Sequence, residues 1–253
     1  FHFLIAKFLF VFKNREIKKH TVFWRKDCKI IMIPNLINIE YKFVNEKTLK
    51  KKFINSIKNI INERNIKLLI FDCDGTLMDT LALHYSAWNE AFSLLGYKFI
   101  EQDEFIRDYA GVSGNDMVRT VIIRFGYNLA VGAVLNLKKE LFMAKYISLV
   151  SPIAKTLAIV NKYSSRLKMV VASGCAREAV NQMLELNDVR HFFMQVITFA
   201  DVAYGKPAPD LFLKSAYDQG IDPEHCLVFE DHHAGFAAAV SAGMCYVDIN
   251  QLQ

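Results

Sequence analysis

Two aspartates, Asp72 and Asp74, follow a run of apolar residues that ends at Phe71. Alternate residues of an extended strand point to the same side, so we expect the two carboxylates to leave the strand together. In such a pair, one carboxylate can act as nucleophile or metal ligand while the other transfers protons, provided that their surroundings separate their pKa values. Gly75 permits the sharp turn that lets the backbone approach a ligand. Asp72 and Asp74 are therefore candidate catalytic residues.

Three further groups of polar residues follow later apolar runs. Ser173 and Gly174 offer a hydroxyl and a backbone amide at the start of a predicted helix, which suits an anion. Lys206 lies between a glycine and two prolines, and Glu230 and Asp231 form a second acidic pair. Carboxylates are ligands for a hard cation such as Mg²⁺, whose other ligands are water and substrate phosphate. The set predicts an Mg²⁺ site beside a site for phosphate oxygens.

The apolar runs that precede these residues are predicted to be buried strands, because each is short and rich in β-branched or aromatic residues. Helix-length segments separate the last four runs, and this alternation predicts a parallel α/β sheet with helices on both faces. Ligands of such sheets lie beyond the carboxyl ends of the strands. The predicted strands are Ile66–Phe71, Leu167–Ala172, Gln195–Phe199, Cys226–Phe229 and Cys245–Ile249; the helices between the last four are Arg177–Leu186, Pro209–Gln219 and Gly235–Ala242.

The segment between the first two strands is too long for one crossover. It holds several runs with apolar residues at helical spacing, the first of which is closed by Gly96. We therefore expect a small helical cap domain over residues 81–151, inserted into a Rossmann-like three-layer core formed by residues 66–80 and 152–253. The predicted cap helices are Leu81–Leu95, Gln102–Tyr109, Asn115–Phe125 and Val134–Leu149.

Residues 1–65 differ in composition from the rest of the chain. They hold no glycine and 15 Lys and Arg against 5 Asp and Glu, whereas the remainder holds 16 against 21. One helix is predicted, over Glu46–Arg64. It is interpreted as a basic amphipathic helix that contacts an anionic membrane or nucleic acid, or as a helix packed on the following domain. A third interpretation is a dispensable or artefactual extension, because AT-rich DNA encodes Lys, Ile, Asn and Phe in almost any frame.

The composition excludes several classes of protein. Of the 253 residues, 53% are hydrophobic and 23% charged, which is unlike disordered or collagen-like chains. The apolar stretch Phe1–Phe12 is shorter than the roughly 20 residues that cross a membrane. Five cysteines without C-x-x-C spacing favour reduced thiols in a cytoplasmic protein over disulfides or a zinc site. We expect no nucleic-acid partner, no stable membrane span, and a monomer or weak dimer.

The order of these motifs carries a family resemblance. The segment Asp72-Cys73-Asp74-Gly75-Thr76-Leu77, followed by Ser173, Lys206 and Glu230-Asp231, resembles the four motifs of the haloacid dehalogenase-like hydrolase superfamily. The resemblance covers residues 66–253, and the inserted helices are similar to the small helical cap of that superfamily. Within it, the chain resembles the β-phosphoglucomutase-like branch, and its C-terminal part is similar to bacterial fructose-1-phosphate/6-phosphogluconate phosphatases.

This resemblance implies an Mg²⁺-dependent phosphomonoester hydrolase that works through an aspartyl-phosphate. Asp72 would be the nucleophile, and Asp74 would protonate the leaving alcohol and then accept a proton from water. The implied ligands of Mg²⁺ are Asp72, the backbone carbonyl of Asp74, and Asp231, with Glu230 in or beside the coordination sphere.

The resemblance also implies which residues bind the phosphoryl group of the substrate. Ser173, Gly174 and Lys206 would hold the phosphate oxygens, whose charge must be neutralised. Thr76, grouped with them by its motif position, would support the loop. The implied substrate is a small phosphorylated metabolite such as a sugar phosphate.

One departure from the branch bears on the reaction. β-Phosphoglucomutases carry an arginine, in a Gly-Val-Ser-Arg motif, that grips the second phosphate of a bisphosphate intermediate; this chain has Gly111-Val112-Ser113-Gly114. A guanidinium is the natural bidentate clamp for a phosphate, so its loss favours hydrolysis over isomerisation. β-Phosphoglucomutase activity is the alternative. A second alternative, a catalytically inactive binding descendant, would be expected to lack a motif residue, and none is missing.

Four further residues are candidates for contacts with the substrate. His84, on the first predicted cap helix, either contacts the substrate or gates Asp74, or else is a polar residue at the cap hinge. Gly111 and Ser113 belong to the cap motif. Arg177 lies early in the helix after Ser173, where it either reaches a phosphate or carboxylate of the substrate or lies on the surface.

Overall fold

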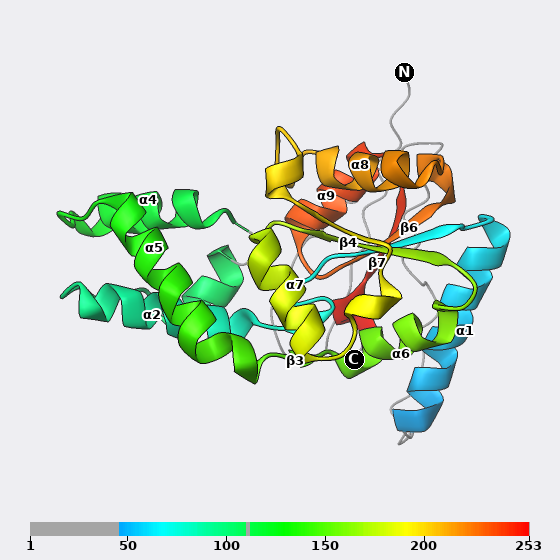
Figure 1. Cartoon of the computed structure of the whole chain (residues 1–253), viewed down its shortest axis with the longest axis horizontal. Helices are drawn as coiled ribbons and strands as arrows, with labels where there is room; N and C mark the ends of the chain where they lie inside the picture. The colour runs from blue at the N-terminus through cyan, green and yellow to red at the C-terminus, as the bar shows by residue number, and fades with distance from the viewer. Residues whose placement is uncertain (1–45, 110–111, 253) are drawn as a thin grey trace, which may run out of the picture.

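The computed structural model describes residues 46–109 and 112–252. A five-stranded sheet with the order β5-β4-β1-β6-β7 lies at its centre, and every neighbouring pair of strands is parallel (Figure 1). The predicted parallel α/β sheet is confirmed, and β1 is its middle strand. The strands are β1 (Leu68–Phe71), β4 (Lys168–Ser173), β5 (Gln195–Thr198), β6 (Cys226–Glu230) and β7 (Cys245–Asp248).

Helices cover both faces of the sheet, as the sequence predicts. Because successive side chains of a strand point to opposite faces, Leu69 and Phe71 pack in one cluster with α1, α6 and α7, while Leu68 and Ile70 pack in another with α8 and α9. The result is a three-layer core. These helices are α1 (Glu46–Glu63), α6 (Ala154–Tyr163), α7 (Arg177–Leu186), α8 (Asp210–Gln219) and α9 (His233–Ser241); single 3₁₀ turns are Arg190–Phe192, Phe199–Asp201, Pro223–His225 and Ile249–Leu252.

The inserted segment forms a helical cap that projects to one side of the sheet, on the left of Figure 1. It has a small core of its own, built around Trp88, Phe92 and Phe99. The predicted helix Val134–Leu149 is correct only in its first part, because α-helical pairing ends at Leu141 and tighter and wider turns follow. The cap elements are α2 (Leu81–Leu94), α3 (Gln102–Glu104), a π-helix (Phe105–Tyr109), α4 (Gly114–Phe125), α5 (Val131–Leu141), a second π-helix (Phe142–Tyr146) and a 3₁₀ turn (Ile147–Leu149).

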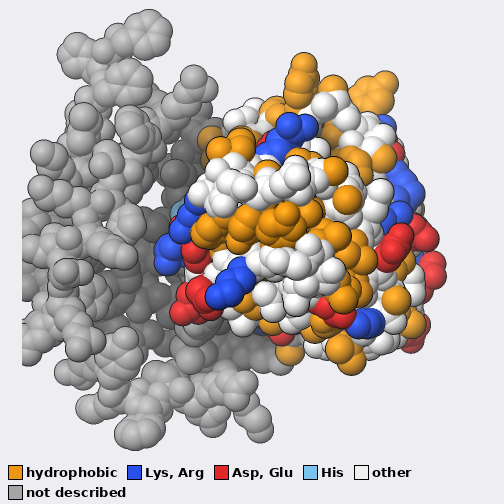
Figure 2. Space-filling view, turned by 90° about the vertical axis from the view of Figure 1, so that its left-hand side faces the viewer, with side chains coloured by type: hydrophobic (Ala, Val, Ile, Leu, Met, Phe, Trp, Pro, Cys, Tyr) orange, Lys and Arg blue, Asp and Glu red, His pale blue; other side chains and the backbone are white. Residues whose placement is uncertain are grey.

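A two-stranded antiparallel ribbon joins the cap to the core. It pairs β2 (Met78–Asp79) with β3 (Ser151–Pro152), where the chain enters and leaves the insertion. The end of the molecule that the cap forms carries apolar side chains in a band between charged groups, as Figure 2 shows. Exposed apolar residues of the cap include Leu94, Ile123 and Phe125.

Helix α1 lies before the first strand and packs on the same face of the sheet as α6. The helix predicted over Glu46–Arg64 is confirmed over Glu46–Glu63. Ile57 is 1% exposed and Ile60 is 7% exposed, and both belong to the larger core cluster. This burial fits a helix packed on the following domain, whereas residues 1–45 lie outside the described residues. None of the described helices has the length and apolar character needed to span a membrane.

The burial of α1 predicts that it contributes to the stability of the core. Replacing Ile57 by alanine removes apolar contacts and leaves a cavity, so we expect Ile57→Ala to lower the free energy of unfolding by about 2–5 kcal/mol. The exposed neighbour Asn59 is the control, and Asn59→Ala should change it by less than about 0.5 kcal/mol. Urea denaturation of both variants measures the difference, and an unchanged midpoint for Ile57→Ala would contradict the assignment of α1 to the core.

Candidate functional site

A buried lysine joins the carboxylates at the ends of two neighbouring strands. Asp72 follows β1 and is 7% exposed, and Glu230 ends β6 and is 2% exposed. Lys206 Nζ lies 2.5 Å from Asp72 Oδ1 and 2.6 Å from Glu230 Oε1, and it donates to the backbone oxygen of Ala172 at 3.2 Å. The structure thus brings Lys206 together with Asp72, which is 134 residues away in the sequence, and with Glu230, which is 24 residues away.

The charges of this cluster do not balance. Burial raises the pKa of Asp72 well above its usual value, and the charge of Lys206 opposes this shift only in part. Burial disfavours the charged form of Lys206, but Asp72 and Glu230 outweigh that effect and raise its pKa. Burial and the neighbouring Glu230 raise the pKa of Asp231 to about 7. Three carboxylates therefore share one ammonium, which is an arrangement that a divalent cation would relieve.

The same carboxylates meet the requirements of a hard metal ion. Oxygen atoms of Asp72, Glu230 and Asp231 all lie within 4.8 Å of one another. Thr76 donates its hydroxyl hydrogen to Asp231 Oδ1 at 3.1 Å and so holds that carboxylate in place. An all-oxygen set of this kind suits Mg²⁺. The side chain of Asp74 belongs to a different group of residues.

Two glycines leave the space that the carboxylates occupy. Gly75 has a φ of +77°, and a Cβ at this position would lie 2.3 Å from Asp231 Oδ2. At Gly235, in the first turn of α9, a Cβ would lie 2.0 Å from the carboxyl group of Glu230. Sequence reasoning identified Gly75 as a turn residue but did not single out Gly235, whose role depends on a contact that forms only in the fold.

Asp74 lies at the end of a chain of side chains that begins in the cap. His84 Nε2 lies 2.8 Å from Asp74 Oδ1, and Lys138 Nζ lies 3.0 Å from His84 Nδ1. An ammonium group can only donate, so Nδ1 accepts from Lys138 and the ring proton sits on Nε2, from where it is donated to Asp74. His84 is on α2 and Lys138 on α5. This line of hydrogen bonds therefore links the cap directly to a carboxylate of the core.

This chain of hydrogen bonds keeps Asp74 ionised. Burial opposes its ionisation, but hydrogen bonds from His84, Cys175 and Thr80 favour the ionised form, and the pKa of Asp74 falls below its usual range. Burial and the charge of Lys138 lower the pKa of His84, which favours its neutral form. Lys138 was missed by the sequence reasoning, because nothing in its neighbourhood distinguishes it from Lys139; only its contact with His84, made where α5 packs on α2, does so.

The other candidate site residues lie in the loop after β4 and in the cap. The hydroxyl of Ser173, at the end of β4, accepts from the amide of Cys175 at 3.0 Å and lies 3.4 Å from Asp74 Oδ2. Gly174 follows Ser173 in the loop that leads to α7. Ser113 caps α4, with its hydroxyl bonded to Asp116. Gly111 lies outside the described residues.

Arg177 is exposed on the surface of the core domain, where its side chain is bonded to the end of β5. Its guanidinium donates to the backbone oxygen of Val196 at 2.7 Å and pairs with Asp201, whose carboxylate also accepts from the amide of Thr198. These contacts tie the start of α7 to the end of β5. Among the described residues, no contact joins Arg177 to the carboxylate cluster.

Gly114, the position expected for the arginine of the mutases, lies against an aromatic ring. Gly114 opens α4, and a Cβ built on it would lie 3.1 Å from the ring of Trp88. The ammonium of Lys138 lies 5.1 Å from the centre of the same ring, which is within the range of a cation–π contact. A side chain at residue 114 would require Trp88 to shift by a few tenths of an ångström.

Comparison with known proteins identifies the family of the chain. Residues 69–249 match the model of the haloacid dehalogenase-like hydrolases. Fructose-1-phosphate phosphatase YqaB of Escherichia coli (strain K12) is 32% identical over 187 residues, which cover 73% of this chain and 96% of that protein. β-Phosphoglucomutase of Bacillus subtilis (strain 168) is 27% identical, over 74% of this chain and 85% of its own length.

A solved structure supports the same assignment at the level of the fold. CbbY from Rhodobacter sphaeroides, in complex with phosphate, superposes with a TM-score of 0.63 at 24% identity, covering 72% of this chain and 84% of its own. The family model matches most of the chain, and the similarity to YqaB covers nearly all of that protein. Both comparisons indicate the same family. The chain therefore belongs to the haloacid dehalogenase-like hydrolase family.

Proposed function

We propose that this protein is an Mg²⁺-dependent phosphatase of small phosphorylated metabolites, sugar phosphates in particular, and that it works through an aspartyl-phosphate on Asp72. The observation that carries the proposal is the buried contact of Lys206 with Asp72 and Glu230. The substrate class is supported by the relatives, which include fructose-1-phosphate phosphatase and, at 24% identity, 6-phosphogluconate phosphatase of E. coli. A cytoplasmic location and a monomeric or weakly dimeric state stay predictions from the sequence.

The oxygen ligands would come from two strand ends. Asp72, Asp231 and the backbone carbonyl of Asp74 would hold Mg²⁺, with Glu230 in or beside the coordination sphere. When bound, the cation supplies positive charge against the phosphoryl oxygens and fixes their orientation. Its binding would also favour the ionised forms of the carboxylates, whose pKa values are raised in its absence.

The chain's own residues would perform the transfer in two steps. Asp72 attacks phosphorus, so a carboxylate–phosphorus bond forms as the bond to the leaving alcohol oxygen breaks, and Asp74 gives that oxygen a proton. Asp74 then takes a proton from a water molecule that attacks the phosphorus of the aspartyl-phosphate and releases inorganic phosphate. Lys206 and Ser173 hold the equatorial oxygens, where negative charge is concentrated.

Asp74 must carry a proton before it can act as an acid, although its hydrogen bonds, including the one from His84, lower its pKa and keep it ionised. The negative charge of a bound phosphoryl group nearby would raise its pKa and allow it to be protonated. Lys138 fixes the tautomer of His84 within the cap, and the hydrogen bond from His84 to Asp74 exists only while the cap lies against the core. We propose that cap closure thereby sets the proton donor for catalysis.

Hydrolysis is favoured over isomerisation by the cap. A mutase must hold a bisphosphate intermediate by its second phosphate, and the position of the arginine clamp is Gly114, packed against Trp88. An inactive binding protein is disfavoured because a buried lysine with three carboxylates is costly to keep without a function.

The reaction type is tested by supplying β-glucose 1-phosphate and fructose 1-phosphate with Mg²⁺ and a trace of glucose 1,6-bisphosphate. We expect Mg²⁺-dependent release of inorganic phosphate without formation of glucose 6-phosphate. Both products are followed in the same reaction, because the bisphosphate is needed to prime a mutase. Glucose 6-phosphate without free phosphate would identify a mutase and overturn the proposal.

The nucleophile is tested by Asp72→Asn. An amide cannot form the aspartyl-phosphate, so we expect kcat to fall at least about 10³-fold while the variant stays folded. The matched control is Asp188→Asn, a change of the same chemistry at a fully exposed residue, which should leave kcat unchanged. Steady-state phosphate release and circular dichroism give the two readouts, and retained turnover by folded Asp72→Asn would refute the role of Asp72.

The cap contact is tested by Lys138→Met, with Lys98→Met as the control because Lys98 is an exposed lysine of the cap. We expect kcat to fall about tenfold or more, which is part of the 10²–10⁴-fold that acid–base catalysis contributes. The pKa of His84 should rise, because the charge of Lys138 lowers it. NMR titration of the ring nitrogens measures this. A loss of kcat with an unchanged pKa of His84 would assign Lys138 to cap structure alone.

A further inference from the structure

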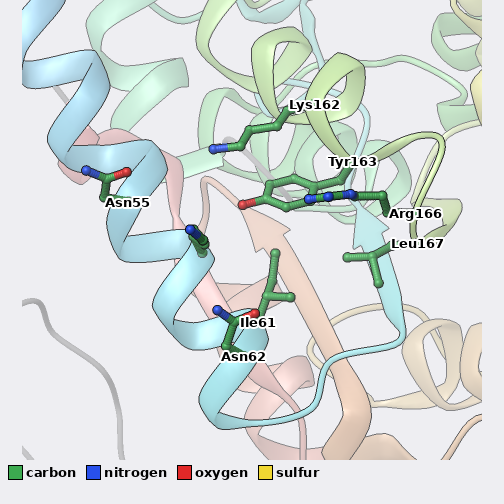
Figure 3. Close-up of a pocket in the computed structure, with 8 residues that line it drawn as sticks. Asn55, Ile61, Asn62, Lys162, Tyr163, Arg166 and Leu167 are labelled. Carbon is green, nitrogen blue, oxygen red and sulfur yellow. The ribbon is translucent and has the colours of Figure 1, made fainter.

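A pocket outside the catalytic cluster lies between α1 and α6. It has a volume of about 330 Å³, which falls within the range of sites for small ligands. Figure 3 shows side chains from both helices turned toward the gap between them. The helix α1 precedes the residues that match the family model, which begin at residue 69, so one wall of the pocket is supplied by a part of the chain that lies outside that model.

The lining of this pocket is strongly one-sided in charge. Lys58 of α1 and Lys162 and Arg166, at and after the end of α6, all line it, and among the described residues no Asp or Glu does. No ion pair links these three cations to a carboxylate in the described part of the chain. Asn55 and Asn62 add side-chain amide groups. The pocket therefore has donors and positive charge in excess.

A buried hydroxyl without a partner also faces this pocket. Tyr163 is only 4% exposed, and its hydroxyl has no hydrogen-bond partner within the described residues. Figure 3 shows the hydroxyl directed toward α1, across the gap between the helices. Burial raises the pKa of Tyr163, so the phenol keeps its proton and is a donor. A buried polar group of this kind is normally satisfied, by a protein group, a water or a ligand.

We infer that the pocket between α1 and α6 binds a small polyanion of the phosphate class, such as a phosphorylated metabolite. The guanidinium of Arg166 and the ammonium groups of Lys58 and Lys162 pair with its charge, and the Tyr163 hydroxyl donates to one of its oxygens. Because α1 forms one wall, the bound anion bridges the extension and the core and stabilises their contact. This inference is independent of the proposed phosphatase activity.

The test titrates inorganic pyrophosphate into the full chain by calorimetry, without divalent metal so that no turnover occurs. We expect one site per chain. The double variant Lys162→Ala/Arg166→Ala should weaken binding at least tenfold, and Tyr163→Phe, which removes only the hydroxyl, should weaken it severalfold. The control Lys98→Ala/Arg107→Ala removes two exposed cations of the cap and should leave the affinity within twofold. Pyrophosphate should also raise the melting temperature of the wild type but not of the double variant.

The active site is separated from the pocket by Ser173→Ala, which should leave pyrophosphate binding unchanged. Loss of binding in Ser173→Ala with retention in the double variant would place the anion in the active site and overturn the inference, as would the absence of any binding. Vesicles of phosphatidylcholine with phosphatidic acid distinguish a lipid headgroup from a free anion. Vesicle binding that depends on Lys162 and Arg166, without binding of pyrophosphate, would overturn the assignment to a soluble anion.

Discussion

The contact of the Lys206 ammonium with Asp72 and Glu230 is the interaction on which the rest of this structure depends. A charge that is removed from water is costly unless it is paired, and here the lysine lies within 2.6 Å of two carboxylates that are each less than a tenth exposed. The parallel sheet makes this possible, because β1 and β6 are neighbours and their carboxyl ends deliver both carboxylates to the same place. Gly75 and Gly235 then leave room for Asp231 and Glu230.

A second constraint couples this cluster to the cap. The cap is joined to the core by the short ribbon β2–β3, and the line from Lys138 through His84 to Asp74 crosses from one to the other. The protonation of the general acid and base would then depend on where the cap lies. Gly114, the expected position of the arginine in the mutases, also lies in the cap, against Trp88. In the proposed function this one small domain would bear on both the proton transfer and the choice of reaction.

Much of the fold and of the cluster could be predicted from the sequence. The strands are short apolar runs that end in polar residues, and the parallel topology requires those ends to lie at one edge. Asp72 and Glu230 follow from these two facts, whereas Lys206 lies in the loop after β5 and was singled out by its motif. Thr76 was placed in the loop, and its bond to Asp231 now accounts for it. Other features depend on distances between segments that no local pattern records. Lys138 and Gly235 act through contacts made only in the fold.

The interpretation of individual side chains and elements was also limited by tertiary context. The helix predicted over Val134–Leu149 has a continuous apolar pattern, yet its α-helical part ends at Leu141, and a π-helix and a 3₁₀ turn follow up to Leu149. Arg177 stands at a helix start that suits an anion, but its guanidinium is engaged by Val196 and Asp201. The sequence predicts that helix α1 is basic and amphipathic. Its apolar stripe is explained by the burial of Ile57 and Ile60 against the core.

The central claim is that the carboxylate of Asp72 becomes covalently phosphorylated. Rapid mixing of the enzyme with Mg²⁺ and fructose 1-phosphate, followed by quenching and reduction with borohydride, converts an acyl phosphate to an alcohol. Mass spectrometry of the peptide that holds residue 72 should then show homoserine at that position, dependent on substrate and absent without it. Homoserine at another aspartate, the corresponding five-carbon alcohol at a glutamate, or no reduced residue at all while phosphate is released in the same mixture, would contradict the account.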